Sequence, residues 1–211
     1  MLPPKLPVLH EEMLEDAISQ AMGEDRDIEA CHFFGDALPD AEGETLEFSG
    51  CHFEKCVFQP RGTNRLVFVD CVMEKCDLTG MRFEKSTFQR VSFRECRMVG
   101  TQFSQTPLMN VSFDHCAMSF SGFTEIKAQH ILFSDCVMKE SNFFRFKWQD
   151  WVLRSCILKQ AEIHETVLKG LDVRSCDIGG IAVEFAALRG LKVTRNQALQ
   201  LSGLLGLDIQ E

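Results

Sequence analysis

Ten cysteines are the residues of this 211-residue chain best suited to redox chemistry or to metal binding. The closest pairs, Cys51/Cys56 and Cys71/Cys76, are separated by four residues, and no pair has the C-x-x-C spacing of redox and structural zinc sites. The N-terminal sequence has no cationic stretch followed by a long apolar one, as a secretory signal would have. We therefore expect a cytoplasmic protein with ten reduced thiols, no metal and no cofactor.

The histidines and carboxylates form no recognisable catalytic motif. His10-Glu11 and His164-Glu165 begin like a zinc-protease motif, but each lacks the second histidine. No glycine-rich phosphate loop and no nucleophile elbow occurs in the sequence. We expect no enzymatic activity. Four histidines are expected to point outward into solvent, namely His52, His115, His130 and His164.

Charge is distributed unevenly along the chain. The net charge is −9 and 45% of the residues are hydrophobic, which is typical of a globular protein with a sizeable core. Residues 1–45 contain 12 acidic and 2 basic residues, whereas residues 46–211 contain 19 acidic and 20 basic ones. The excess negative charge therefore lies entirely in the N-terminal segment. No apolar run approaches the roughly 18–20 residues that a membrane-spanning helix needs.

Large apolar residues recur at every fifth position, beginning clearly with Phe48, Phe53 and Phe58. Between Phe48 and Val193, 28 of the 30 residues whose numbers end in 3 or 8 are apolar and larger than alanine. A helix repeats at about 3.6 residues and a strand at 2, so neither buries such a stripe. The period of five requires another architecture.

The cysteines reveal a longer period of twenty residues. All ten have numbers ending in 1 or 6, and from Cys56 to Cys176 they recur at every twentieth residue. Four five-residue units thus form one larger repeat, which indicates a solenoid with four sides per coil and about 7–8 coils. In this arrangement the cysteines are small buried residues stacked in a ladder; a redox or metal-binding column is the alternative.

The bends between sides are predicted at residues whose numbers end in 0 or 5. Seven glycines fall in this class, and tight bends with positive φ favour glycine or asparagine, such as Asn110. Pro60 cannot adopt a positive φ, so residues 60–65 are expected to form an outward loop or a distorted coil. The loop residues that could contact a partner are Arg61, Gly62, Asn64 and Arg65.

The stretch "CDLTGMRFEKSTFQRVSFRECRMVGTQF" resembles the pentapeptide-repeat proteins, whose consensus is A(D/N)LXX with a central leucine or phenylalanine. The resemblance covers residues 46–193, with a weaker start near residue 31, and implies an all-β fold, a right-handed quadrilateral β-helix. Phe146 and Trp151 occupy positions that normally hold small residues. We expect the coil to widen locally around them.

The C-terminal sequence "LKVTRNQALQLSGLLGLDIQE" resembles the Qnr-type quinolone-resistance and albicidin-resistance members of that family. The resemblance implies a C-terminal helix over 194–211 that closes the solenoid and mediates a homodimer. Thr194 and Gln197 fit a capping box. The alternative is that this segment only covers the last coil. The candidate interface residues are Leu199, Leu201, Leu204, Leu205, Leu207 and Ile209.

At the other end, residues 8–22 are predicted to form an amphipathic helix within an N-terminal segment, residues 1–30, that precedes the solenoid of residues 31–193. The helix would either cover the first coil or dock a partner, and residues 34–45 are expected to be irregular. The residues assigned to its apolar face are Leu9, Met13, Ala17, Ile18 and Ala21.

Contacts with a partner must then come from the outer faces. Leu132 and Val152 are twenty residues apart, as are Val137 and Ile157, so each pair is expected to stack on adjacent coils. Together with Phe144 they form a candidate exposed apolar band, a feature that often marks a protein contact. Exposed β-branched residues are also favourable in strands without any partner.

The resemblance to Qnr-type proteins implies binding to DNA gyrase or topoisomerase IV and protection from quinolone-type drugs, explained in that family by a rod that mimics DNA. The near-neutral repeat region is a poor match to a DNA mimic unless one face concentrates the acidic residues. A cytoplasmic scaffold that binds another protein is the alternative. Direct nucleic-acid binding is disfavoured because acidic residues interleave the basic ones, which are Lys75, Arg82, Lys85, Arg90, Arg94 and Arg97.

Overall fold

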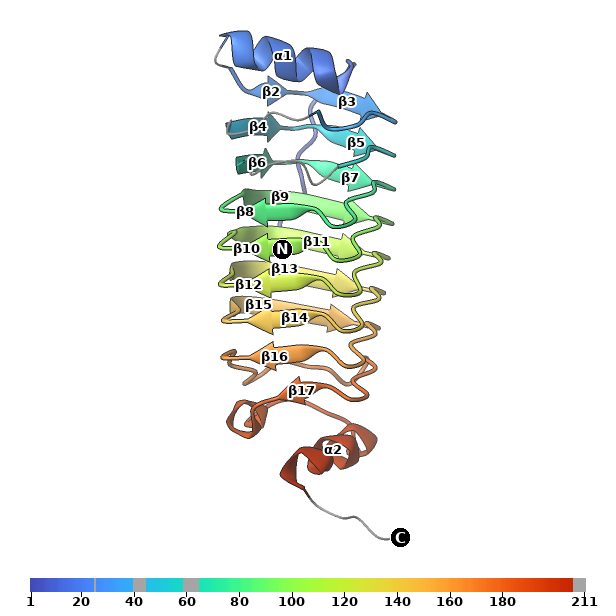
Figure 1. The fold of residues 1–211 in the computed structure, drawn as a ribbon, viewed down its shortest axis with the longest axis vertical. Helices are drawn as coiled ribbons and strands as arrows, with labels where there is room; N and C mark the ends of the chain where they lie inside the picture. The colour runs from blue at the N-terminus through green and yellow to red at the C-terminus, as the bar shows by residue number, and fades with distance from the viewer. Residues whose placement is uncertain (25, 40–44, 59–64, 207–211) are drawn as a thin grey trace.

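The computed structural model describes residues 1–24, 26–39, 45–58 and 65–206. Figure 1 shows a rod of stacked coils with a short helix at each end. The predicted four-sided β-solenoid is therefore confirmed. Within the described residues, no helix is long and apolar enough to cross a membrane.

Two parallel sheets run along the rod. The eleven strands of the larger sheet are β1 (His10–Glu11), β2 (Ile28–Glu29), β3 (Cys31–Phe34), β4 (Thr45–Ser49), β5 (His52–Glu54), β6 (Arg65–Val69), β7 (Val72–Glu74), β9 (Thr87–Arg94), β11 (Leu108–Asp114), β13 (Lys127–Ser134) and β15 (Lys147–Arg154). The six strands of the smaller sheet are β8 (Arg82–Glu84), β10 (Gln102–Ser104), β12 (Gly122–Thr124), β14 (Asn142–Phe144), β16 (Glu162–His164) and β17 (Ala182–Val183).

From β2 onward, every residue that takes part in strand pairing has its partner one coil, or twenty positions, away along the chain, as Phe103 has in Phe123. We name the sides by their central residues. Side 1 contains Phe88, side 2 Phe93, side 3 Met98 and side 4 Phe103, each with its counterparts in other coils. The long strands, such as β11, bend across sides 1 and 2, side 4 is the six-stranded sheet, and side 3 is joined by isolated bridges.

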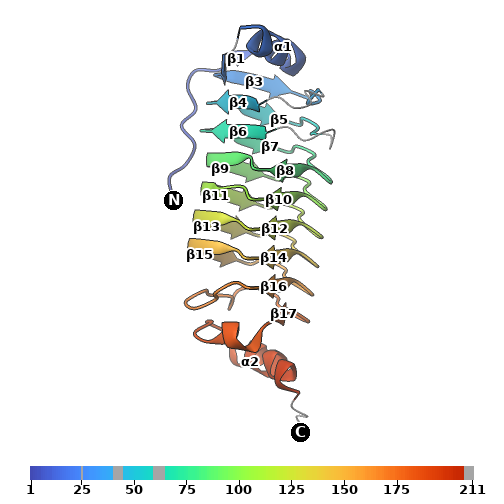
Figure 2. The ribbon, with the colours of Figure 1, turned by 60° about the vertical axis from the view of Figure 1, so that its left-hand side comes forward.

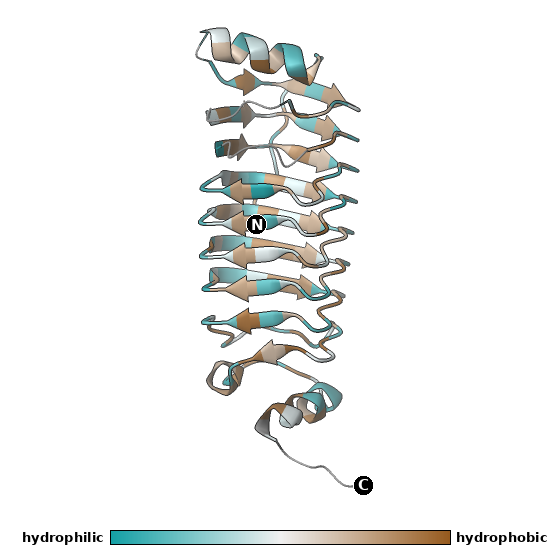
Figure 3. Ribbon diagram, viewed as in Figure 1, coloured by the Kyte–Doolittle hydropathy of each residue, from teal (hydrophilic) through white to brown (hydrophobic). Residues whose placement is uncertain are grey.

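The interior is filled by columns of phenylalanine rings. Phe113 stacks on Phe93 and Phe133 with ring centroids 4.8 and 4.7 Å apart, and all three rings are fully buried. This distance equals the spacing of hydrogen-bonded strands. One ring per coil on the same side is therefore stacked by the backbone register itself. The alternation of hydrophobic and hydrophilic positions along the strands is visible in Figure 3.

The small inward residues donate hydrogen bonds to the preceding coil. Cys96 Sγ lies 3.3 Å from the carbonyl oxygen of Met73, and Thr106 Oγ1 lies 2.9 Å from that of Phe83. All ten cysteines are buried and free, as the ladder interpretation predicted. Burial raises the pKa of Cys71, and the neighbouring Cys116 sulfur together with burial raises the pKa of Cys136 to about 12. The Cys71 and Cys136 thiols therefore stay protonated and pack as small apolar groups.

The corners adopt positive φ angles, as predicted, but most of them are not glycine. The expected glycines have positive φ, and so do twenty non-glycine residues in the part of the chain that the structure describes, including Lys85, Glu95 and His115. Most bends are fixed by a backbone hydrogen bond to the next coil, such as that from Glu95 N to the Asp114 oxygen at 2.9 Å, whereas Ser155 N and Glu165 N donate to side chains of the next coil. The register therefore imposes the conformation on residues that would otherwise avoid it.

The irregularity expected around Phe146 and Trp151 lies one coil further along. Both side chains are buried, with ring centroids 4.8 Å apart. β15, which contains Trp151, is the last strand on sides 1 and 2 within the described chain. The Trp148 indole N–H instead donates to the Val167 carbonyl at 2.6 Å. The coil that follows these bulky residues thus has no strand on sides 1 and 2 within the described chain.

The N-terminal helix, α1 (Leu14–Glu24), covers the first coil. The predicted helix over 8–22 was wrong at its start, because residues 10–11 form β1. The apolar face was partly right, since Ala17, Ile18 and Ala21 are buried, but Leu14 is buried in place of Met13, which is 60% exposed. Both β2 and β3 already belong to the stacked coils.

An N-terminal arm, residues 1–9, runs beside the rod in Figure 2 and was not predicted from the sequence. Leu2 N donates to Asn110 Oδ1 at 2.8 Å and Lys5 N donates to Asp70 Oδ1 at 3.0 Å. Arg90 makes two hydrogen bonds to the same carboxylate and lowers the pKa of Asp70. The arm thus follows the corner between sides 1 and 2 over several coils.

The C-terminal end is closed by α2 (Arg195–Ser202), after the 3-10 turn η1 (Phe185–Leu188) and before η2 (Gly203–Leu205). The predicted capping box of Thr194 and Gln197 is present. The Gln197 Nε2 group also donates to the carbonyls of Val173 and Cys176, each at 2.8 Å. Helix α2 therefore satisfies backbone groups at the end of the solenoid.

The corner geometry predicts that glycine is more favourable than alanine at a bend and less favourable in a strand. Glu140 is an exposed corner with φ 54, whereas Arg82 is an exposed residue of β8. Glu140→Gly is expected to be more stable than Glu140→Ala by about 1 kcal/mol, because glycine avoids the left-handed penalty. Arg82→Gly is expected to be less stable than Arg82→Ala by about 0.5–1 kcal/mol. Urea unfolding of the four variants measures both differences, and the same sign at both positions would contradict the corner argument.

Candidate functional site

The sides of the rod offer an apolar surface around one corner. Leu132 and Val152 pair in register on side 2, and Val137 and Ile157 pair on side 3. The corner between these two sides is formed by Asp135 in one coil and by Ser155 in the next. We call the four apolar residues the apolar corner. Val152 is exposed and the other three are half-buried.

Phe144 does not belong to this surface. It lies in β14 on side 4, whereas Leu132 lies on side 2, two sides away along the coil. The guanidinium of Arg145 lies over its ring, 4.8 Å from the ring centroid. The structure therefore brings together four of the five residues of the predicted band and separates the fifth.

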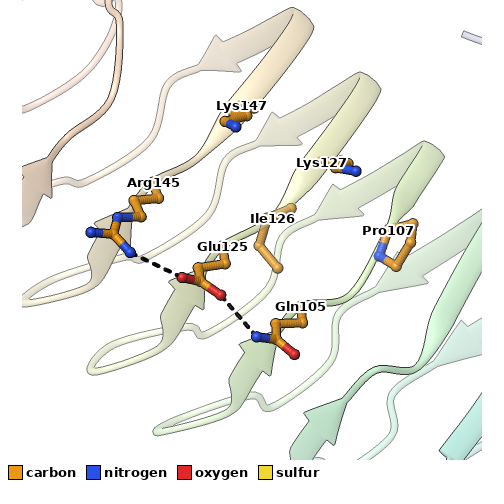
Figure 4. A pocket seen from close by; sticks show the side chains of 7 residues that line it. All are labelled: Gln105, Pro107, Glu125, Ile126, Lys127, Arg145 and Lys147. Carbon is orange, nitrogen blue, oxygen red and sulfur yellow. Dashed lines mark hydrogen bonds and ion pairs between the residues drawn. The ribbon is translucent and has the colours of Figure 1, made fainter.

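A shallow groove of about 500 Å³ opens where side 4 turns into side 1, and Figure 4 shows its lining. Glu125 accepts hydrogen bonds from Gln105 at 2.9 Å and from Arg145 at 3.1 Å. Gln105 and Arg145 together lower the pKa of Glu125. Lys127 and Lys147 stand in register at the opposite edge. The groove combines charged rows with the side chain of Pro107, above the fully buried Ile126.

The other predicted contact residues are distributed as follows. Of the loop residues, Arg61, Gly62 and Asn64 lie outside the described residues, and Arg65 is exposed at the start of β6. In the C-terminal set, Leu199 is 53% and Leu204 41% exposed, whereas Leu201 is buried at 8%. The side chain of Leu205 is not among those that the structure describes, and Leu207 and Ile209 lie outside the described residues. Leu201 therefore packs in the core, unlike the two exposed leucines.

The histidines differ from the expected solvated set at one position. His115, His130 and His164 are partly to largely exposed. His52 instead stacks on His32 with ring centroids 5.0 Å apart, and its side chain is only 21% exposed. Burial and the neighbouring His32 lower the pKa of His52. The prediction failed there because the alternation of the strand does not reveal stacking between outward residues of adjacent coils.

No side of the rod concentrates negative charge within the described residues. We count each side together with the corner that follows it, between residues 46 and 193. Side 1 carries three acidic and five basic described residues, side 2 six and six, side 3 three and three, and side 4 five and four. The acidic residues are thus matched by basic ones on every side.

Residues 46–111 match the family model described as "Pentapeptide repeat region". Over this part of the chain, the resemblance to pentapeptide-repeat proteins is therefore confirmed. No curated protein is significantly similar to the chain.

Among solved structures, the chain is similar to HetL, a pentapeptide repeat protein involved in heterocyst differentiation regulation from Nostoc sp. strain PCC 7120. The identity is 9%, the TM-score is 0.48, and the match covers 86% of this chain and 94% of HetL. It is also similar to trypsin-treated QnrB1, a plasmid-mediated fluoroquinolone resistance protein, with 20% identity and a TM-score of 0.39. That match covers 88% of this chain and 90% of QnrB1.

Proposed function

We propose that this pentapeptide-repeat protein acts without catalysis, by binding another protein along the sides of its rod. The observation that supports this proposal is the apolar corner, where Leu132 and Val152 meet Val137 and Ile157 across one bend. Each pair places partly exposed apolar side chains in register on adjacent coils, and exposed apolar surface of this kind often marks protein contacts. The groove beside Lys127 and Lys147 offers a second, charged contact surface.

DNA gyrase or topoisomerase IV is the proposed partner, in the cytoplasm, with protection from quinolone-type drugs as the proposed outcome. The resemblance of the C-terminal sequence to Qnr-type proteins motivates this choice. Contact would depend on side-chain packing, because the balanced charges of all four sides give the rod little of the negative potential of DNA. In this respect the proposed mode differs from simple DNA mimicry.

A cytoplasmic scaffold for a different protein is the second candidate. The near-equal numbers of acidic and basic residues on every side favour it, since a partner that normally grips DNA presents a basic surface. Direct binding of nucleic acid remains disfavoured for the same reason.

We also propose that the chain forms a homodimer through its C-terminal end. Leu199 and Leu204 are large, apolar and exposed on the elements that close the rod. Leu201 is excluded from such an interface, because it is buried within the chain itself.

The gyrase proposal predicts rescue of DNA supercoiling from a fluoroquinolone when the purified protein is titrated into gyrase. Leu132→Glu combined with Val137→Glu is expected to raise the half-effective concentration at least tenfold, because charge replaces apolar contact at the centre of the patch. Ser112→Glu is the matched control, since Ser112 precedes Leu132 in the same register column. Rescue that is unaffected by the double variant would contradict the assigned surface. If the wild-type protein neither rescues nor inhibits gyrase at large excess, the scaffold function is favoured.

The dimer proposal predicts a mass of about twice the 24.0 kDa chain by light scattering coupled to gel filtration. Leu199→Glu combined with Leu204→Glu is expected to yield a folded monomer. Val167→Glu, at another exposed apolar residue, should leave the mass unchanged. A monomeric wild-type protein at micromolar concentration would refute the dimer.

A further inference from the structure

Three potential metal ligands of different chemistry meet at the N-terminal end of the rod. His10 Nε2 lies 3.4 Å from Cys31 Sγ, Cys31 Sγ lies 3.5 Å from Glu12 Oε2, and Glu12 Oε2 lies 3.4 Å from His10 Nε2. The three atoms therefore form a nearly equilateral triangle.

The backbone explains why these residues meet. β1 and β3 are parallel neighbours, and His10 stands directly opposite Cys31 in their register. Glu12 follows His10 by two residues, and alternate residues of an extended segment point to the same side. The His10 amide also donates to the Ala30 carbonyl at 2.9 Å, which anchors this pairing. Two side chains of one segment thus face one side chain of the next strand.

The size of the triangle matches a face of a tetrahedral zinc site. Zinc binds sulfur at about 2.3 Å, imidazole nitrogen at about 2.0–2.1 Å and carboxylate oxygen at about 2.0–2.2 Å. At a tetrahedral angle, these bond lengths place the ligand atoms about 3.3–3.6 Å from one another. All three observed distances fall within that interval.

Hydrogen bonds alone leave this arrangement poorly satisfied. A proton on His10 Nε2 or on the thiol can serve only one edge of the triangle at a time. The Cys31 thiol has another acceptor in the Glu29 carbonyl at 3.2 Å, so it does not need the triangle as a hydrogen-bond partner. A cation at the centre would satisfy all three ligand atoms together.

The surroundings hold one ligand in position. Gln20 Nε2 donates to Glu12 Oε1 at 3.2 Å, which leaves Oε2 facing His10 and Cys31. Gln20 Oε1 in turn accepts from Arg26 at 2.8 Å. Such outer partners orient metal-binding carboxylates in known sites.

The site is open on one side and lies in an acidic segment. It borders a pocket of about 340 Å³ that also contacts Asp27 and Glu29. Residues 1–45 carry 12 acidic and only 2 basic residues, which favours a cation over an anion. The His10 side chain is 58% exposed, so a fourth position is accessible to water.

We propose that His10, Glu12 and Cys31 bind one Zn²⁺ ion, with water as the fourth ligand. The ion would join β1 to β3 and thereby fix α1 over the first coil. A thiolate, an imidazole and a carboxylate form a ligand set that suits zinc better than magnesium or calcium. The cluster of Asp114, His115 and Asp135 is the competing candidate, but His115 and Asp135 are exposed and it contains no thiolate.

The test is titration of the full-length, reduced and metal-free protein with Co²⁺ and then Zn²⁺. We expect one Co²⁺ per chain with a thiolate charge-transfer band, its displacement by one Zn²⁺, and a higher Tm in the presence of Zn²⁺. His10→Ala and Cys31→Ala should each weaken Zn²⁺ binding at least 100-fold and abolish the rise in Tm. His10 is exposed, so its variant should fold normally.

Two variants serve as controls. Cys51→Ala removes the next thiol of the same column, buried like Cys31, and should bind Zn²⁺ as the wild type does. His115→Ala removes the competing cluster and should also leave binding unchanged. Absence of the charge-transfer band, or binding that survives His10→Ala and is lost in His115→Ala, would overturn the proposal.

Discussion

The twenty-residue register is the constraint on which the rest of this structure depends. Each coil donates backbone hydrogen bonds to its neighbours, and successive coils pair without a shift on the long sides from β9 to β15. This register stacks equivalent side chains directly above one another, so phenylalanine rings such as Phe113 form continuous columns. It also forces residues such as Glu95 into left-handed corners that their side chains do not favour. The repeat thus fixes the packing of the interior. Residues that differ from coil to coil are confined to the outward positions and to the two ends.

That division explains where function can reside. Apart from Cys31 in the first coil, the inward positions, including the other nine thiols, are occupied by packing, so chemistry and recognition depend on outward residues and on the two ends. The apolar corner arises because Leu132 replaces the polar residue found at most equivalent positions, whereas Val137 stands at a position that holds alanine or valine in several other coils. The zinc proposal concerns the first coil, where a segment outside the repeat supplies His10 and Glu12 to face a repeat cysteine. Both surfaces are departures from the repeat rather than parts of it.

Much of the fold could be predicted from the sequence because a periodic core is a strong signal. The period of five identified the inward residues, and the spacing of cysteines such as Cys76 and Cys96 identified the length of a coil. The prediction of positive φ at the corners was right, but glycine is not its cause. The register imposes the same positive φ on residues such as Lys85. The effect of Trp151 on the following coil required the three-dimensional packing.

The sites were less predictable, because they combine residues that no local pattern connects. The meeting of His10 with Cys31 depends on β1 pairing with β3, and the sequence analysis assigned residues 8–22 to a helix. The N-terminal arm was missed for a similar reason: Lys5 and Leu2 bond to Asp70 and Asn110 through backbone amides, which carry no sequence signal. Phe144 lies on side 4, whereas the apolar corner lies between sides 2 and 3. Its separation from the corner could have been predicted by counting sides as well as coils.

Backbone hydrogen exchange, followed residue by residue by NMR, is the most direct test of the central role of the register. The amides of exposed corners such as Lys85, Glu95 and Glu140 bond to the next coil at 2.9 Å, so they should be as strongly protected as those of the central strands. Residues 167–169, which follow the last long strand, should exchange faster. Rapid exchange at the corners, with protection confined to the strands, would contradict the account.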